Sequence, residues 1–251
     1  MAAPSYDAAP DRARADRGGN VKTLQPAPGV VARHLAGLPA FRGLRAADRE
    51  RIATESLLQR YGKDEALFRA GHPATFLWVL ARGSVRVLRE RPDGQPKVVH
   101  LLTAPSLVAE VPTLTGEPLP ATAVCGEESL VVAVPRAVLV DAVRRDPEFA
   151  LRLLGAVFER LQQLTRALAR HGQRGAAARV GAWLLGLARD GGGGVLPAAK
   201  KDVADYLGLK PESFSRALAV LREEGAVDVT DESFRILDRT ALEAVLKDAE
   251  R

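Results

Sequence analysis

Residues 199–225 read AKKDVADYLGLKPESFSRALAVLREEG, and their pattern predicts the arrangement of the C-terminal part of the chain. Its first part, 199–206, predicts a short helix that a glycine turn at 207–209 ends. Pro211 then stands at the first position of a second helix, where its missing N–H is tolerated, and Gly225 ends that helix. Two helices joined by a short turn that contains glycine form a helix-turn-helix.

The residues after the turn build a small apolar core. Phe214, Leu218 and Leu221 follow the i, i+4, i+7 spacing of one helix face, so we expect them to point inward. Beyond this helix, Ala226–Val229 and Phe234–Leu237 are short apolar runs separated by a polar turn. They predict a strand pair beside the two helices, which makes the C-terminal unit a winged helix.

The opposite face of the second helix carries polar side chains in its first turns. Glu212, Ser215 and Arg216 lie at i, i+3 and i+4. Arginine can bond guanine O6 and N7, glutamate accepts from cytosine N4, and serine adapts to either role, so this face suits base reading. An acid favoured by the helix dipole, paired with Arg216 at i+4, is the alternative. Four further side chains flank the face and suit phosphate contacts: Lys200, Lys201, Lys210 and Ser213.

The composition narrows the class of protein. Of 251 residues, 47% are hydrophobic and 27% charged, which excludes wholesale disorder. No apolar run is long enough to span a bilayer and the N-terminus lacks a secretory pattern, so we expect a cytoplasmic protein without a membrane partner. One cysteine excludes an intramolecular disulfide and a four-cysteine cluster. The net charge is +5, and the window 160–222 holds eleven basic and four acidic residues, a net of +7, which favours nucleic acid as a partner.

A different pattern precedes this C-terminal part. Residues 31–38 and 46–58 suit short helices, and after them come short runs rich in β-branched residues, punctuated by glycine and proline. Many short strands with turn signals predict an antiparallel roll or barrel. The strand runs are 75–80, 84–88, 97–102, 121–125 and 130–134.

A long helix connects the two parts. From Ala150 to Leu168 apolar residues recur at alternating spacings of four and three, which is the seam of a coiled coil, and the helix should run about 25 residues. Such a seam favours an identical partner helix in a symmetric dimer, although packing of the stripe on the roll is the alternative. The expected dimer contacts are Leu154, Val157, Leu161, Leu164 and Leu168.

These patterns predict an α+β protein: an N-terminal antiparallel β-roll, a long dimerisation helix and a C-terminal winged helix-turn-helix. The expected divisions are a disordered tail at 1–29, an effector-sensing roll at 30–145, the dimerisation helix at 146–172 and the DNA-binding domain at 173–251.

From Val31 to Leu242 this order resembles the CRP/FNR family of bacterial transcription regulators, whose rolls are of the cyclic-nucleotide-binding type. The resemblance covers several short motifs: Gly62, Leu67–Gly71, Gly83–Arg86, Ala109-Glu110, Pro120–Ala123 and Lys201–Leu221. It implies a homodimer that binds double-stranded DNA, with RNA polymerase as a further partner and activation of transcription as the role.

The string Pro211-Glu212-Ser213-Phe214-Ser215-Arg216 looks most like the FNR and Dnr branches of that family. Their Glu-x-x-Ser-Arg pattern reads TTGAT half-sites in an inverted repeat. The resemblance therefore implies that Glu212, Ser215 and Arg216 read bases, with two half-sites about one helical turn apart.

The effector is harder to infer. Family members that bind cyclic nucleotides carry Arg and then Ser or Thr ten residues after a Glu, whereas here Glu110 is followed by Pro120 and Ala121, so we do not expect cyclic AMP to bind in the usual way. The N-terminal cysteines that hold an iron–sulfur cluster in FNR members are missing, and we predict no metal site. Haem is the remaining candidate cofactor. The chain has four histidines, His34, His72, His100 and His171, and His100 is the candidate ligand. The expected effector pocket is formed by Glu110, Pro120, Ala121, Thr122 and His100.

Two other functions remain open. The roll could serve a regulatory ligand-binding module without a role on DNA, although the face of Glu212, Ser215 and Arg216 argues against this. An enzyme is not favoured, because the chain has no phosphate-binding loop, paired metal-ligand motif or nucleophile–base pattern. Cys125, on a predicted strand, fits a small buried residue better than a thiolate sensor.

Overall fold

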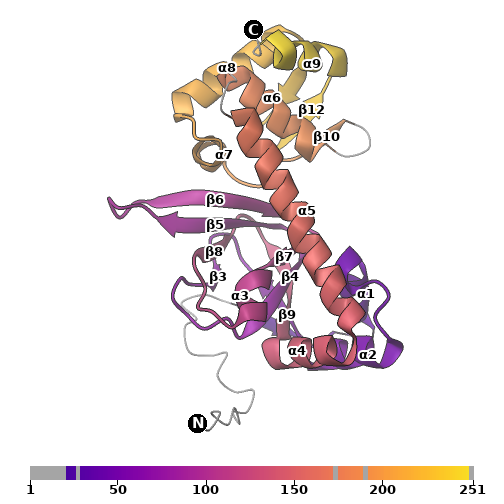
Figure 1. Ribbon diagram of the computed structural model, residues 1–251. Helices are drawn as coiled ribbons and strands as arrows, with labels where there is room; N and C mark the ends of the chain where they lie inside the picture. The colour runs from indigo at the N-terminus through magenta and orange to yellow at the C-terminus, as the bar shows by residue number, and fades with distance from the viewer. Residues whose placement is uncertain (1–20, 27–28, 172–174, 189–191, 249–251) are drawn as a thin grey trace.

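The computed structural model describes residues 21–26, 29–171, 175–188 and 192–248, and within helices it leaves undescribed the side chains of 160, 163–171 and 247–248. The chain forms a β-roll with flanking helices, a long helix that rises from it, and a compact C-terminal unit at the far end of that helix (Figure 1). This is the α+β architecture that the sequence predicts.

The roll consists of two antiparallel sheets. The larger has the strand order β1-β2-β9-β4-β7 and the smaller β3-β8-β5-β6. Their inner faces enclose a core that includes Trp78, Leu80, Val85 and Val131. The strands are β1 (Lys22–Leu24), β2 (Leu57–Tyr61), β3 (Ala66–Phe68), β4 (Phe76–Arg82), β5 (Ser84–Glu90), β6 (Pro96–Thr103), β7 (Ser106–Val108), β8 (Thr122–Cys125) and β9 (Ser129–Pro135).

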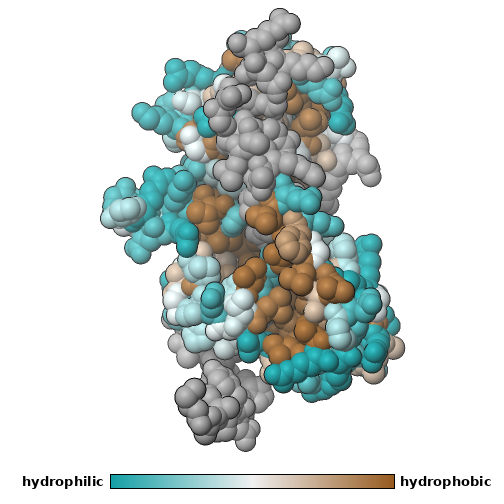
Figure 2. Space-filling view, viewed as in Figure 1, coloured by the Kyte–Doolittle hydropathy of each residue, from teal (hydrophilic) through white to brown (hydrophobic). Residues whose placement is uncertain are grey.

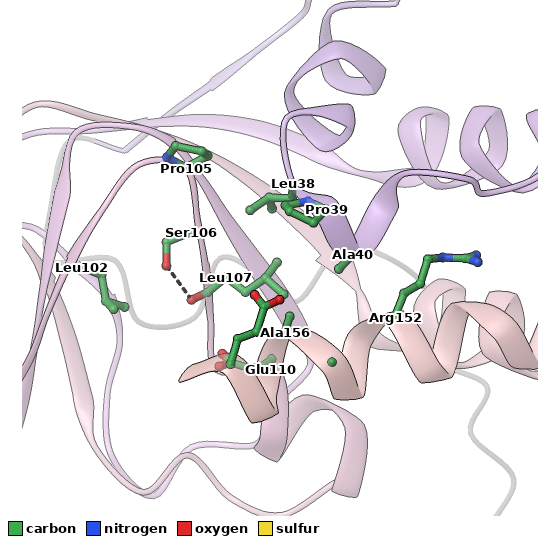
Figure 3. A pocket seen from close by; sticks show the side chains of 12 residues that line it. Leu38, Pro39, Ala40, Leu102, Pro105, Ser106, Leu107, Glu110, Arg152 and Ala156 are labelled. Carbon is green, nitrogen blue, oxygen red and sulfur yellow. Dashed lines mark hydrogen bonds between the residues drawn. The ribbon is translucent and has the colours of Figure 1, made fainter. Parts of the chain in front are cut away.

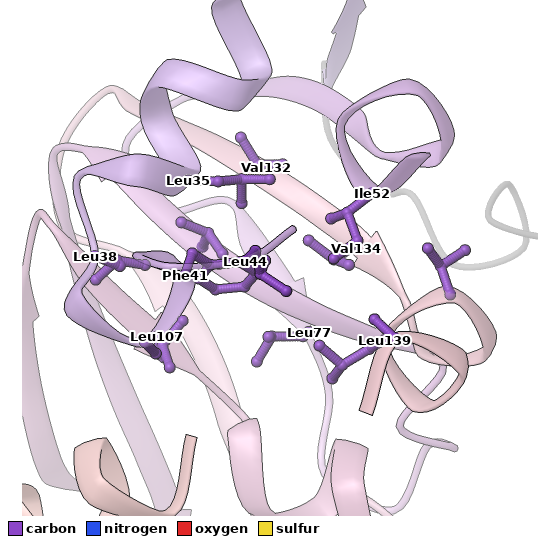
Figure 4. Close-up of a cluster of buried hydrophobic side chains, with 14 of the residues drawn as sticks. Leu35, Leu38, Phe41, Leu44, Ile52, Leu77, Leu107, Val132, Val134 and Leu139 are labelled. Carbon is purple, nitrogen blue, oxygen red and sulfur yellow. The ribbon is translucent and has the colours of Figure 1, made fainter. Parts of the chain in front are cut away.

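Helices cover the outer face of the larger sheet and create a second core there (Figure 4). Phe41, Ile52 and Leu139 from three helical segments meet Leu77 and Val134 from the sheet, and all five are at most 1% exposed. Burial of a side chain of this size contributes about 1.5–3 kcal/mol. The helical segments are α1 (Val30–Ala36), η2 (Pro39–Phe41), α2 (Ala46–Glu55), α3 (Glu110–Thr115) and α4 (Arg136–Arg145).

The long helix α5 spans Pro147–His171, which confirms the predicted length of about 25 residues. Its first turns are anchored in the helical core, because Phe149 and Leu153 are buried there and the ring of Phe149 packs against Phe41 with centroids 5.5 Å apart. The predicted glycine stop after His171 lies outside the described residues.

The C-terminal unit is the predicted winged helix. Around one core it packs α6 (Ala176–Leu187), α7 (Lys200–Tyr206), α8 (Pro211–Glu223) and α9 (Arg239–Asp248). A three-stranded sheet of order β10-β12-β11 lies beside them, formed by Gly193–Val195, Ser233–Ile236 and Val227–Val229 respectively. The sequence pattern predicts β11 and β12 but not β10, because the glycines of β10 are typical of a loop.

Two expectations for the N-terminal part are wrong. Lys22–Leu24 belongs to the expected tail, yet it forms β1 and pairs with β2 in the register Thr23↔Gln59. The helix expected over 46–58 ends at Glu55, and Leu57 and Leu58 begin β2. An adjacent pair of leucines fits a helix face as well as a buried strand, so the pattern alone could not separate the two.

Candidate nucleic-acid interface and effector cavity

The turn between α7 and α8 has the geometry that the sequence indicates. Gly208 adopts a φ of 65°, in the left-handed region that glycine enters without steric cost. The Leu209 N–H bonds the Ala204 carbonyl at 2.8 Å and so closes the end of α7. Pro211 then stands at the start of α8, whose inner face places Phe214, Ala217, Leu218 and Leu221 in the core, each at most 3% exposed.

The outer face of α8 presents the three predicted base-reading residues. Glu212, Ser215 and Arg216 are all exposed. Arg216 Nε donates to the backbone carbonyl of Glu212 at 3.4 Å and not to its carboxylate, so the guanidinium and the carboxylate both remain on the surface. A helix with an apolar inner side and a polar first-turn surface can enter a major groove.

The four predicted phosphate contacts lie around the same surface but differ in their surroundings. Lys201 and Lys210 are exposed, and Ser213 is half-buried in the first turn of α8. Lys200 Nζ bonds Asp231 at 2.8 Å in the turn between β11 and β12, and this contact holds the pKa of the Asp231 carboxyl below its usual value. Lys200 therefore also ties α7 to the wing.

The described half of α5 exposes a row of large apolar side chains. Leu151 is 65% exposed, Leu154 46%, Phe158 58% and Leu161 55%. They form an apolar patch that follows the helix (Figure 2). Val157 is half-buried, and the side chains of Leu164 and Leu168 lie outside the described residues.

Leu151 and Phe158 are not in the predicted seam. They belong to a neighbouring frame with the spacing 3, 4, 3 through Leu154 and Leu161, and the stripe on α5 is wide enough for both frames. Only the packing of Phe149 and Leu153 on the roll shows which side of the stripe stays outside.

A cavity of about 360 Å³ lies between α5, η2 and the segment from β6 to α3 (Figure 3). Its walls are mostly apolar, from Leu38, Leu102, Leu107 and Ala156 among others, and Glu110 and Glu159 also line it. Arg152 lines the rim with its stem, and its guanidinium points away from the cavity to Asp146, with 3.0 Å between Nη2 and Oδ2.

The residues of the expected effector pocket do not all meet there. Of the five, only Glu110 lines this cavity. Thr122 Oγ1 accepts a hydrogen bond from the Ala70 N–H at 3.1 Å, the Pro120 carbonyl accepts one from Arg89, and Ala121 is buried in the roll core. His100 is half-buried on β6, opposite Val87.

The positions of the histidines test whether haem could bind at this cavity. No histidine lines the cavity, and among the described residues no three His, Cys, Asp or Glu side chains gather as a metal site. The residues at this cavity therefore do not fit haem. Cys125 is fully buried, and desolvation raises the pKa of its thiol to about 12, which suits a packing residue and not a reactive thiolate.

No described helix combines the length and the apolar character needed to cross a membrane.

Comparison with known proteins identifies both parts of the chain. Residues 58–146 match the family model of the cyclic nucleotide-binding domain, and residues 178–245 match that of the Crp-like helix-turn-helix domain. The nitrogen fixation regulation protein FixK of Azorhizobium caulinodans is 32% identical over 193 residues, which are 72% of this chain and 76% of FixK.

Two further likenesses extend over most of the molecule. The cyclic AMP receptor protein of Thermus thermophilus is 29% identical over 84% of this chain and 98% of its own length. A crystal structure of a CRP-family transcriptional regulator from the same organism superposes with a TM-score of 0.61 at 25% identity, over 76% of this chain and 98% of that one. The chain thus belongs to the CRP/FNR family of transcription regulators, with a cyclic nucleotide-binding domain followed by a DNA-binding helix-turn-helix.

Proposed function

We propose that the protein is a homodimeric regulator that binds an inverted repeat of TTGAT-like half-sites and responds to an effector at its roll. The observation that carries this proposal is the exposure of Glu212, Ser215 and Arg216 on the outer face of α8, while the apolar side of the same helix is buried. A helix that serves only packing has no reason to present this set. The alternative of a ligand-binding module without a role on DNA loses support, because the chain carries a helix-turn-helix of the family's DNA-binding type.

In this proposal Arg216 bonds the guanine of the half-site with its two-pronged guanidinium, Glu212 accepts from a cytosine amino group, and Ser215 completes the reading. Lys201, Lys210 and Ser213 contact phosphates and set the position of the helix in the groove, with Lys200 as a further cation beside the wing. Sequence preference then resides in α8, and most of the affinity resides in the charge around it.

The dimer forms along α5. Four apolar side chains between 46% and 65% exposed, in a row on one helix, are costly in water and suit an identical helix across a two-fold axis. The other predicted dimer contacts are Val157, which lies within this row, and Leu164 and Leu168, whose side chains lie outside the described residues. A two-fold axis along α5 also supplies the symmetry that an inverted repeat requires.

The effector acts through the roll. Cyclic AMP in the usual mode is not proposed, because Pro120 and Ala121 replace the basic and hydroxyl residues that would clamp its phosphate. The cavity beside α5 is the better candidate site, because a ligand there would touch both the roll and the dimer helix and could favour one of their arrangements. The protein would act in the cytoplasm as an activator that contacts RNA polymerase.

A competition assay tests the base-reading assignment. The affinity of Arg216→Ala is compared on the TTGAT inverted repeat and on the same DNA with the guanines replaced. We expect the preference for the intact repeat to fall about ten- to hundredfold for each half-site, because one bidentate arginine–guanine pair contributes about 1–3 kcal/mol and the dimer loses two. Binding to unrelated DNA should change little.

Lys201→Ala is the matched control, since it removes a cation from the same surface without removing a base reader. It should weaken binding to all sequences alike. Because the dimer loses one cation in each protomer, the slope of log K against log salt should become shallower by about 1.8. Unchanged selectivity in Arg216→Ala would refute the role of α8, whatever the control shows.

A further inference from the structure

The hairpin of β5 and β6 reaches out of the roll and lies beneath α7, the first helix of the helix-turn-helix (Figure 1). The two elements are more than 100 positions apart in sequence, yet three polar contacts join them. We call these contacts the clasp: Arg86 with Asp202, Arg91 with Asp205, and the Val98 N–H with Asp205.

Arg86 is the most enclosed member of the clasp. Its guanidinium bonds Asp202 of α7 at 2.6 Å through Nη1 and Asp64 of the roll through Nη2, so one side chain bridges the two units. The side chains of Arg86 and Asp202 are each 15% exposed. At this degree of burial salt screens the pair less than it would a surface pair.

Asp205 completes the clasp one turn later on α7. Its Oδ2 accepts the Val98 backbone N–H at 2.7 Å, and its Oδ1 pairs with Arg91 near the tip of the hairpin. A carboxylate that accepts both a backbone amide and a guanidinium makes charge-assisted bonds, which are stronger than neutral ones. Since Asp202 and Asp205 are three residues apart, both face the hairpin from one side of α7.

Two packing contacts accompany the polar ones. Leu101 of β6 packs against the core of the winged helix. Gly126, in the turn after β8, lies so near the Pro197 carbonyl that a Cβ at this position would approach the oxygen to 2.7 Å. The Gly126 N–H bonds the Ser84 carbonyl at the start of β5, so contact with the winged helix extends along the hairpin from Arg91 to this turn.

We propose that the clasp holds the winged helix in one orientation on the roll, and that the operator is bound in this clasped form. Because α7 and α8 share one core and a short turn, fixing α7 also fixes α8. Glu212, Ser215 and Arg216 remain exposed when the clasp is closed, so it does not cover the reading face. A fixed orientation removes part of the ordering cost of binding two half-sites at once. The effect on DNA rests on the proposed function, whereas the clasp itself does not.

The test removes both acids in Asp202→Ala/Asp205→Ala and measures two quantities. The first is backbone hydrogen exchange of the dimer without DNA, which should become faster at Val98 because its acceptor in α7 is gone. The second is affinity for the operator, which should fall about tenfold, since only the clasped fraction of the protein is competent to bind.

Asp228→Ala is the control, because Asp228 is an exposed acid on β11 of the same unit whose side chain makes no hydrogen bond or ion pair with the other described residues. Removal of an acid by itself lowers the electrostatic repulsion between the protein and DNA. The control should therefore bind DNA as tightly as the parent protein or more tightly. The two effects therefore have opposite signs.

The outcomes separate the two proposals. Unchanged exchange at Val98 would overturn the clasp. Faster exchange with equal or tighter operator binding would overturn its role in presenting α8. If the parent protein itself shows no preference for the TTGAT repeat, the proposed function fails, and the exchange result still decides whether the clasp exists.

Discussion

The winged helix and the roll differ in how much of their site a single stretch of chain contains. In the winged helix the candidate base readers Glu212, Ser215 and Arg216 lie within five residues of one helix, and the structure exposes all three. In the roll, the five residues expected to form one pocket come from three separate segments, and of the five only Glu110 lines the cavity beside α5. A site within one helix follows from helical periodicity, whereas a site shared between strands depends on register and on the closure of the roll.

The same contrast holds for charge. The winged helix displays exposed cations such as Lys201 and Lys210 around its reading face. The interior of the roll is apolar around Cys125, and the cavity beside α5 carries carboxylates. We therefore expect the winged helix to bind a polyanion, and we propose the largely apolar cavity beside α5 as the place for a small ligand.

The largest effect is expected for Phe158→Asp, which would show whether the two regions act only through a dimer. A charge in the exposed row of α5 should dissociate the dimer and lower operator affinity more than about a hundredfold, because a monomer engages one half-site. Sedimentation velocity measures the dissociation of the dimer, and titration with operator DNA measures the affinity. Leu237→Asp is the control, as Leu237 is 59% exposed against 58% for Phe158 but lies outside α5. A Phe158→Asp protein that still sediments as a dimer would remove the assignment of the interface.

Phe214→Ala tests whether the two regions have separate cores. Loss of this fully buried ring should cost the winged helix about 3–5 kcal/mol. Hydrogen exchange should accelerate in α8 and stay slow in β4. Leu77→Ala, in the core beneath α1 and α2, should reverse that pattern at a cost of about 2–5 kcal/mol. Equal acceleration in both regions for either variant would show one cooperative unit instead of two.

The smallest effect concerns Cys125 and asks whether the roll interior is closed. Its thiol is fully buried with a pKa raised to about 12, so at pH 8 only a very small fraction is thiolate. Alkylation of the native protein should be negligible, while the same protein in denaturant should react fully. Mass spectrometry measures the extent. Rapid alkylation without denaturant would mean that the roll opens readily, and it would support a role for Cys125 as a thiol sensor.

Elements with a strong local signal could be predicted from the sequence. The apolar period of α5 predicts a long helix. Pro211 marks the start of α8 and Gly208 the end of α7, because both boundaries follow from local backbone sterics. Weak signals failed at β1 and β10, which are strands of three residues each. So short a strand carries no readable alternation and exists because a neighbouring strand supplies its hydrogen bonds.

The apolar stripe of α5 is a strong sequence pattern, yet it does not predict which side of the helix is exposed. The apolar spacing predicts that this segment is a helix. Two different rows of apolar residues, one with Val157 and one with Phe158, fit that same spacing. The first turns of the helix pack on the roll through Phe149 and Leu153, and this contact leaves Leu151 and Phe158 on the outside. The direction of a helical face relative to another domain is a property of both partners, so one helix sequence does not specify it.

Local patterns in the sequence predict the two halves of this protein, the long helix between them and the polar face of α8, because each depends on interactions within a few turns of chain. The packing of distant segments instead sets where the cavity opens, which side of α5 is exposed, and that Arg86 and Asp202 meet across the two halves. Those contacts join residues far apart in the chain, and no periodicity relates such residues until the chain has folded.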